Sequence, residues 1–224
     1  MCGIAAIFAY HPDAPPIDPA QLSRMHDTLA PRGPDGEGKW VADDSRVAFA
    51  HRRLSISDLS ETGAQPMRSA DGALQIVFNG EIYNYRALRD QLIAEGAVFV
   101  SNSDTEVLLH LYARKGPAML DDLRGMFAFA ISDERRKGPF LARDPYGIRP
   151  LYFADDGRTI RVASQVKALL TGSNIDTAPA PAEHAGFFLF GYVPEPWTLY
   201  RGIEALPAGG SLWIDNSGRG EPRR

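Results

Sequence analysis

The 224-residue sequence has a single cysteine, Cys2, and no long apolar run. One cysteine excludes an internal disulfide and fits a reducing compartment. The longest apolar runs, 185–193 and 125–131, fall far short of the ~18 residues that cross a bilayer. No basic residue precedes the apolar N-terminal stretch, as one would in a secretory signal. We therefore expect a cytoplasmic protein without a membrane partner.

An excess of positive charge is also absent. Lys and Arg number 24 against 28 Asp and Glu, which gives a net charge of −4, and this balance argues against a nucleic-acid-binding face. Neither glycine-rich phosphate loop, G-x-x-x-x-G-K-S/T or G-x-G-x-x-G, occurs. No two histidines have the spacing of paired metal ligands, so we expect no metal site. The histidines are His11, His26, His51, His110 and His184.

The hydrophobic pattern predicts strands and helices in blocks. Short apolar runs predict strands over 3–10, 47–51, 74–78, 126–131, 140–142, 151–153, 160–163 and 212–214. Apolar stripes between start and stop signals predict helices over 19–29, 84–95, 103–115, 166–170 and 183–190. Hairpin spacing makes the middle third antiparallel sheet, so the predicted fold class is α+β.

Two helix starts have specific cap signals. Asn84 can cap a helix whose Leu88, Leu92 and Ile93 share one face. Ser103, followed three residues later by Glu106, forms a capping-box pattern. We expect each of these two side chains to bond the backbone N–H of the other residue.

The segment 187–192, Phe-Phe-Leu-Phe-Gly-Tyr, has more aromatic residues than a helix near the end of the chain needs. We expect these side chains to pack in the core. A docking surface for a partner is the alternative.

Cys2 is the first candidate for chemistry. A lone cysteine is ordinarily a small buried hydrophobe. If Met1 is removed, however, the thiol and a free α-amine belong to one residue. An α-amine has an unperturbed pKa of roughly 7.7 to 8.0, so it can accept the thiol proton without a histidine partner. One residue would then supply both the nucleophile and the base.

Other residues could serve a cysteine nucleophile. Asn79 and the N–H of Gly80 follow a predicted strand and could stabilise an oxyanion, although Asn-Gly is also a common turn. Arg53 could bind a substrate carboxylate and Asp104 an ammonium group. Each has an ordinary alternative, because most arginines are solvated and an Asp in a first helical turn usually interacts with the helix dipole. An amide hydrolase is therefore one interpretation that these residues permit.

Seven motifs occur in the order found in class-II glutamine amidotransferase domains. The chain resembles most the glutaminase half of glutamine-hydrolysing asparagine synthetases, nearly over its whole length. The motifs are MCGI (1–4), RGPD (32–35), HRRLSI (51–56), FNGEIYN (78–84), SDTE (103–106), GMFAF (125–129) and RDPYGIRPLY (143–152).

This resemblance implies an N-terminal-nucleophile (Ntn) hydrolase fold, a four-layer αββα sandwich of two antiparallel sheets flanked by helices. Cys2 would attack the side-chain amide of glutamine to form a thioester and release ammonia, and water would then release glutamate. By the same resemblance, Asn79 and Gly80 form the oxyanion hole and Arg53 binds the substrate carboxylate. Glu81 and Asp104 bind the substrate amino group.

The resemblance also implies how the domains, cofactors and partners are arranged. Residues 1–214 would form the amidotransferase domain, and 215–224 would form a polar tail, the start of a linker or the end of the chain. The pyrophosphatase loop Ser-Gly-Gly-x-Asp-Ser does not occur. Glutamine hydrolysis would need no cofactor, and ATP and Mg²⁺ would be needed only on a synthetase domain or subunit outside this chain. Glutamine and that synthetase are the expected partners, and a homodimer is a further option.

Two departures from the family pattern are Pro31, where a His usually stands, and Gln165, where a Glu often stands. Because the synthetase half is missing, two alternatives stay open. The chain could hydrolyse another γ-glutamyl amide on its own, or it could be a non-catalytic interaction module with the same fold.

Overall fold

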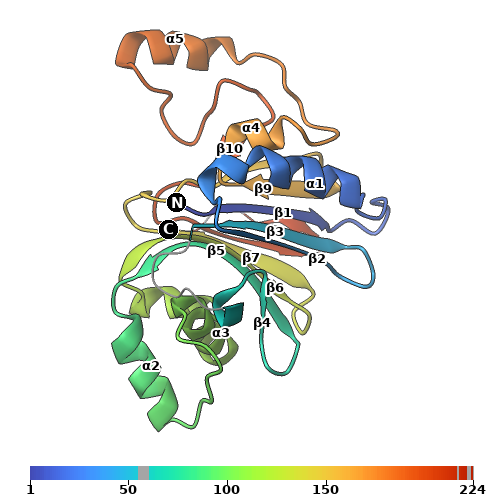
Figure 1. Cartoon of the computed structure of the whole chain (residues 1–224). Coiled ribbons are helices and arrows are strands. Elements are labelled where there is room, and N and C mark those ends of the chain that lie inside the picture. The colour runs from blue at the N-terminus through green and yellow to red at the C-terminus, as the bar shows by residue number, and fades with distance from the viewer. Residues whose placement is uncertain (55–60, 216, 221–222, 224) are drawn as a thin grey trace.

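The computed structural model describes residues 1–54, 61–215, 217–220 and 223. Two six-stranded antiparallel sheets pack face to face, and helices cover both outer faces (Figure 1). This architecture confirms the predicted α+β sandwich. No helix among the described residues is long and apolar enough to cross a membrane.

Each sheet combines hairpins of consecutive strands with strands from distant parts of the sequence. The first sheet has the order β10-β8-β9-β1-β3-β2 and the second β12-β11-β7-β6-β5-β4. The strands of the first are β10 (Glu204–Ala205), β8 (Tyr152–Asp155), β9 (Thr159–Ala163), β1 (Gly3–Ala9), β3 (Val47–Arg53) and β2 (Gly36–Val41). Those of the second are β12 (Gly218–Arg219), β11 (Ser211–Asp215), β7 (Gly138–Arg143), β6 (Gly125–Asp133), β5 (Leu74–Ile82) and β4 (Met67–Arg68).

The helices lie in two outer layers. Over the first sheet lie α1 (Pro19–Thr28) and α4 (Val166–Leu169), and over the second α2 (Tyr85–Ala94) and α3 (Asp104–Lys115) (Figure 1). Three short 3₁₀ turns are η1 (Ala30–Arg32), η2 (Glu61–Gly63) and η3 (Gly116–Asp122). The last described helix is α5 (Pro181–Phe190).

Strand β1 shows why a continuous apolar run becomes a central strand. Alternate side chains point to opposite faces of a sheet. Ile4 and Phe8 accordingly lie in the core between the sheets, whereas Ala5 and Ile7 pack under α1. All seven residues of β1 are buried. The chain therefore enters the core directly after Cys2.

The pattern missed β2 and misplaced the end of β5. Strand β2 is partly exposed and contains Gly36, Glu37, Gly38 and Lys39, because it is an edge strand with only β3 beside it. Its sequence therefore has no apolar run. Strand β5 continues to Ile82, so Asn79 and Gly80 lie within it and not at a strand end or in a turn.

The predicted capping box does not form. Ser103 does cap α3, since its side chain accepts from Thr105 N at 3.1 Å. The carboxylate of Glu106 instead accepts from Val100 N at 2.8 Å, from Ser101 N at 2.7 Å and from Ser101 Oγ at 2.6 Å. Glu106 therefore stabilises the loop before the helix, where it has three donors.

The cap predicted at Asn84 is also different. Asn84 stands at the N-cap of α2 but makes no side-chain capping bond. Its amide donates to Asp122 O at 2.9 Å and accepts from Arg124 N at 3.0 Å. Leu88 and Leu92 are buried as expected, whereas Ile93 is exposed.

The core role expected for 187–192 is wrong. No residue of α5 is buried, and Phe188, Leu189, Phe190 and Tyr192 are exposed. In Figure 1, α5 stands clear of the layer formed by α1 and α4.

Candidate active site

The structure brings all six predicted site residues to one small cavity. Cys2, Arg53, Asn79, Gly80, Glu81 and Asp104 line a space of about 100 Å³. The sheet topology explains the convergence, because β1 begins where the antiparallel β3 ends, with Gly3 opposite Arg52. The ends of β3 and β5 and the start of α3 meet there. In Figure 1 the N-terminus marks this end of the sandwich.

Cys2 is fixed on both its side chain and its backbone. Leu54 N donates to Sγ at 3.4 Å, and Sγ lies 3.7 Å from Leu54 O. Arg32 Nε donates to the carbonyl oxygen of Cys2 at 2.9 Å. The nucleophile candidate is thus held between the residue after β3 and the turn η1. Ser55 and Ile56 of the motif 51–56 lie outside the described residues.

Gly33 allows η1 to lie directly against β3. A Cβ on Gly33 would lie 2.4 Å from the carbonyl carbon of Arg52, which is too close for any side chain. Gly33 therefore lets η1 sit directly on β3 and bring Arg32 to Cys2. The departure at Pro31 lies in the first turn of η1, where a missing N–H costs little.

Asn79 has an unused hydrogen-bond donor. The residue is 1% exposed, and its Nδ2 has no hydrogen-bond partner among the described residues. A buried donor without a partner costs about 1–3 kcal/mol. An amide N–H left unpaired on the wall of a cavity is suited to an oxyanion that forms during a reaction.

Gly80 lies beside Asn79 with no room for a side chain. A Cβ there would lie 2.2 Å from Met126 O. The backbone of Gly80 thus forms part of the cavity wall itself.

Two carboxylates, Asp104 and Glu81, also line the cavity. Asp104 is the first residue of α3, and its Oδ2 accepts from Ile82 N at 3.0 Å, which joins α3 to β5. Burial and, to a smaller extent, the nearby Glu81 carboxylate raise the pKa of Asp104 to about 6, although hydrogen bonds from backbone N–H groups lower it. A cation between Asp104 and Glu81 would relieve both effects, so this pair is suited to an ammonium group.

His51 and Arg53 are the two basic side chains of β3 that line the cavity. Burial lowers the pKa of His51 to about 3. Its Nε2 lies 3.2 Å from Phe78 O, and a neutral imidazole must donate there because a carbonyl only accepts. His51 is therefore occupied and is not a base for Cys2. Arg53 supplies positive charge to the cavity.

Sequence reasoning missed Gln65, Arg32 and Arg149. Gln65 lines the cavity, accepts from Phe78 N at 2.6 Å and donates to Thr105 Oγ1 at 3.2 Å, so it joins β5 to α3. Nothing in its loop sequence indicates this role. Arg32 and Arg149 belong to recognised motifs, which could have indicated them.

Arg149 is delivered by a loop built around Asp144. The Asp144 side chain is fully buried and accepts from Tyr146 N, Ile148 N and Arg149 N at 3.0–3.1 Å. This turn sets Arg149 at the cavity. Burial, together with the positive charge of Arg149, lowers the pKa of Arg32.

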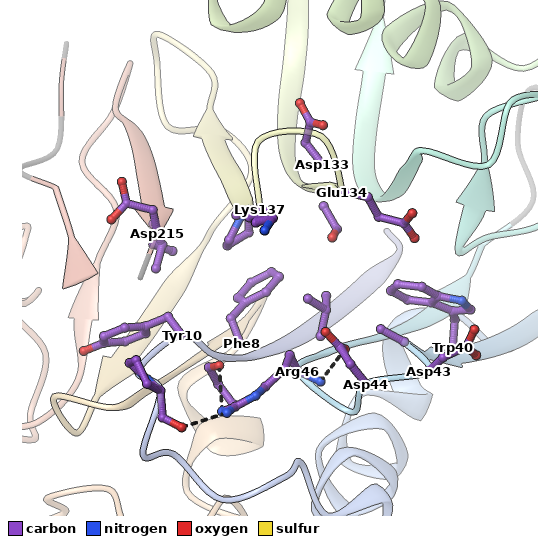
Figure 2. Close-up of a pocket in the computed structure, with 18 residues that line it drawn as sticks. Phe8, Tyr10, Trp40, Asp43, Asp44, Arg46, Asp133, Glu134, Lys137 and Asp215 are labelled. Carbon is purple, nitrogen blue, oxygen red and sulfur yellow. Dashed lines mark hydrogen bonds between the residues drawn. The ribbon is translucent and has the colours of Figure 1, made fainter. Parts of the chain in front are cut away.

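A larger cavity of about 620 Å³ lies at the other end of the sandwich and has none of the six predicted residues in its lining (Figure 2). Its walls include Phe8, Tyr10 and Trp40. The Arg46 guanidinium beside it is bound to backbone carbonyls, among them Ala14 O at 2.9 Å and Pro12 O at 2.8 Å. The six predicted residues therefore belong to the smaller cavity.

Comparison with known proteins agrees with this geometry. Residues 1–223 match the family described as glutamine amidotransferase domain. The chain is 39% identical over 97% of its length to asparagine synthetase (glutamine-hydrolysing) 1 of Bacillus subtilis, and 41% identical over 76% of its length to asparagine synthetase B of Escherichia coli. The matches cover 34% and 30% of those two proteins.

A solved structure described as the allosteric regulatory enzyme of purine biosynthesis superposes with a TM-score of 0.73 at 25% identity, and the match covers 100% of this chain and 49% of that one. The chain spans about a third of the length of the two asparagine synthetases named above. It belongs to the class-II glutamine amidotransferase domain family, and its fold is that of the Ntn hydrolases.

Proposed function

We propose that this protein hydrolyses the side-chain amide of glutamine to glutamate and ammonia through a thioester on Cys2. The observation that carries the proposal is the buried, unpartnered Nδ2 of Asn79 on the wall that also holds the Cys2 thiol. A thiol nucleophile and a waiting oxyanion donor are the two parts that acyl transfer requires.

Removal of Met1 is part of the proposal. Met1 lines the cavity, so its loss both enlarges the space for substrate and frees the α-amine of Cys2. That amine takes the proton from Sγ. Because the pKa of His51 is lowered to about 3, its imidazole is a weak base, and the α-amine is the base that the mechanism uses.

The first half-reaction transfers the acyl group. The thiolate attacks Cδ of glutamine, and the oxygen of the tetrahedral intermediate receives hydrogen bonds from Asn79 Nδ2 and Gly80 N. The C–N bond then breaks, and the protonated α-amine returns its proton to the leaving nitrogen. Ammonia departs and a γ-glutamyl thioester remains.

The second half-reaction repeats these roles with water. The α-amine takes a proton from water as its oxygen attacks the thioester carbonyl. Asn79 and Gly80 again stabilise the oxyanion, and the Cys2 sulfur leaves and regains its proton. Glutamate is released, and the enzyme returns to its starting state.

Substrate selection follows from the charges at the two ends of the cavity. Arg53 binds the α-carboxylate of glutamine, and Asp104 with Glu81 binds its α-ammonium group. A ligand without these charged ends loses its interactions with Arg53, Asp104 and Glu81, which lowers its kcat/KM relative to glutamine. The site therefore favours free glutamine over a glutamine residue within a peptide.

We further propose that the ammonia passes to a synthetase of the asparagine type, in the reducing environment of the cytoplasm. The support is the similarity to asparagine synthetases, of which this chain matches about a third. ATP and Mg²⁺ would act on that synthetase portion.

Replacement of Cys2 tests the proposal directly. Cys2→Ala should abolish glutamate release from glutamine, and an electrophilic glutamine analogue should add its mass to the wild-type protein at Cys2 and not to the variant. Intact mass should show that Met1 is absent from the active protein. Undiminished glutamate release by Cys2→Ala, or full activity with Met1 retained, would refute the mechanism.

A further inference from the structure

The helix α5 and the residues after it form an exposed apolar face. Phe188 is 84% and Leu189 77% exposed, and Phe190, Tyr192 and Trp197 are also largely exposed. Because a large aromatic side chain presents 150–250 Å², this face totals roughly 700 Å² of apolar surface. A typical monomer has a largest patch of about 300–600 Å², and one side of a standard interface buries about 800 Å².

This face is held in place. Residues 181–198 form an excursion whose base is a short antiparallel pairing, with Ala180 N donating to Leu199 O at 3.0 Å and Arg201 N donating to Ala178 O at 3.0 Å. Gly191 ends α5 in the left-handed conformation, with its N–H on Phe187 O. The exposed side chains thus belong to α5, drawn at the top of Figure 1, and to the residues after it, and this excursion is anchored at its base by backbone hydrogen bonds.

The excursion is linked to the wall of the catalytic cavity. Arg143 donates from Nη1 to Glu195 Oε1 at 2.8 Å, from Nη2 to Gly147 O at 2.7 Å and from Nε to Arg149 O at 2.8 Å. The buried Arg143 side chain therefore joins the excursion to the loop that places Arg149 at the cavity. A partner seated on this face would lie close to the place where ammonia forms.

The composition of the face distinguishes its possible occupants. Residues 184–194 contain no Asp, Glu, Lys or Arg. A helix that lies on a lipid surface usually has Lys and Arg on its polar side. Interfaces without charged residues are typical of permanent associations, which resemble a domain core.

We infer that this face, Phe187–Tyr192 with Trp197, binds a synthetase portion. That portion corresponds to the part of the relatives that lies outside the third matched by this chain. The inference rests on the proposed function, which requires such an ammonia acceptor. It places the acceptor against α5, whose excursion is joined through Glu195 and Arg143 to the loop that carries Arg149.

The test compares two matched double variants. In one, Phe188→Ser and Leu189→Ser remove the two most exposed side chains of α5. In the other, Val98→Ser and Val100→Ser change two valines that are 77% and 79% exposed between α2 and α3. The probe is the part of Bacillus subtilis asparagine synthetase 1 outside the matched region, shown to be folded by its synthesis of asparagine from free ammonia.

We expect the wild type and the Val98/Val100 variant to bind this probe, and the Phe188/Leu189 variant to bind at least 30-fold more weakly. Equal binding by the two variants, or no binding by the wild type, would overturn the inference. Two other results would also overturn the inference. One is that the wild type forms a dimer that the Phe188/Leu189 change abolishes, and the other is that the wild type adsorbs to phosphatidylcholine and phosphatidylglycerol vesicles and the same change abolishes this adsorption.

Glutamate release by the isolated proteins is measured in parallel and should be the same for all three. Loss of docking with intact glutamate release supports the inference. Absent glutamate release in the wild type would instead count against the proposed function, whatever the binding result. The two failures are therefore distinguishable.

Discussion

The guanidinium of Arg32 donates to the backbone carbonyl of Cys2 across 2.9 Å. The bond joins a 3₁₀ turn to the residue before β1, and it fixes the peptide group that carries the nucleophile. Arg32 has no place in the proposed bond-making steps. It acts through the position of Cys2.

Arg32→Ala should therefore lower kcat for glutamine hydrolysis on the order of 10- to 100-fold, the range that a small misplacement of a reacting group costs. KM should change much less, since Arg53, Glu81 and Asp104 stay in place. Steady-state kinetics measure the split. Arg86→Ala, on the exposed side of α2, is the control and should leave both constants unchanged. A rise in KM with normal kcat would show that Arg32 binds substrate instead.

Asn79→Ala should reduce kcat about 10²- to 10³-fold, the usual loss when one oxyanion-hole donor is removed. The free energy of unfolding should change little by comparison, because the Nδ2 donor has no hydrogen-bond partner to lose within the part of the chain that the structure describes. Urea titration and kinetics on the same preparations compare the two effects. A large loss of stability with nearly normal kcat would assign Asn79 a structural role.

The pH dependence of substrate capture should report Asp104. The carboxylate must be ionised to bind an ammonium group, and its pKa is about 6. We expect kcat/KM for glutamine to fall as the pH drops below about 6. Asp104→Asn should lower kcat/KM at pH 7.5 and remove this limb of the profile. Asp90→Asn, an exposed carboxylate on α2, should leave the profile unaltered.

Ionisation of Asp104 should have opposite effects on activity and on the free energy of unfolding. Since the pKa of Asp104 is raised from 3.8 to about 6 by folding, its stabilising contribution is complete below pH 3.8 and is lost as the pH rises through 6. Asp104→Asn should therefore gain stability relative to the wild type between pH 4 and pH 7.5, by about 2 kcal/mol. Urea titrations at both pH values measure the difference. An equal difference at the two values would contradict the assigned pKa.

Glu106 provides a test of local structure. Glu106→Ala should destabilise the protein by about 3 kcal/mol, because it leaves Val100 N and the Ser101 donors without their charged acceptor. Ser103→Ala should cost about 1 kcal/mol, the usual loss of one N-cap. Chemical denaturation at neutral pH compares the two variants. Similar small costs would instead fit the capping box that the sequence predicted.

The apolar runs predicted the α+β class, because strands that are buried on both faces, as β1 is, appear as continuous apolar runs. The arrangement as a two-sheet sandwich was implied by the family resemblance. The sequence could not predict β2, whose edge position permits Gly, Glu and Lys. The sequence also could not predict that α5 is exposed, since an apolar helix in the core and an apolar helix at an interface have the same composition.

Some residues of the candidate site could be predicted from the sequence and others could not. The family motifs contain Cys2, Asn79 and Asp104, so the resemblance could assign their roles. Gln65 reaches the site through a loop, and its contacts with Phe78 and Thr105 depend on tertiary packing. No spacing rule indicates such a residue.

The position of β1 has a consequence for thermal inactivation. This strand has a neighbour on each side and a buried residue at every position, and segments of that kind open only when the whole molecule does. The residue in front of it should share that resistance. Heating should therefore give the alkylation rate of the thiol only its ordinary smooth increase with temperature until the cooperative melt, and inactivation and melting should follow one curve.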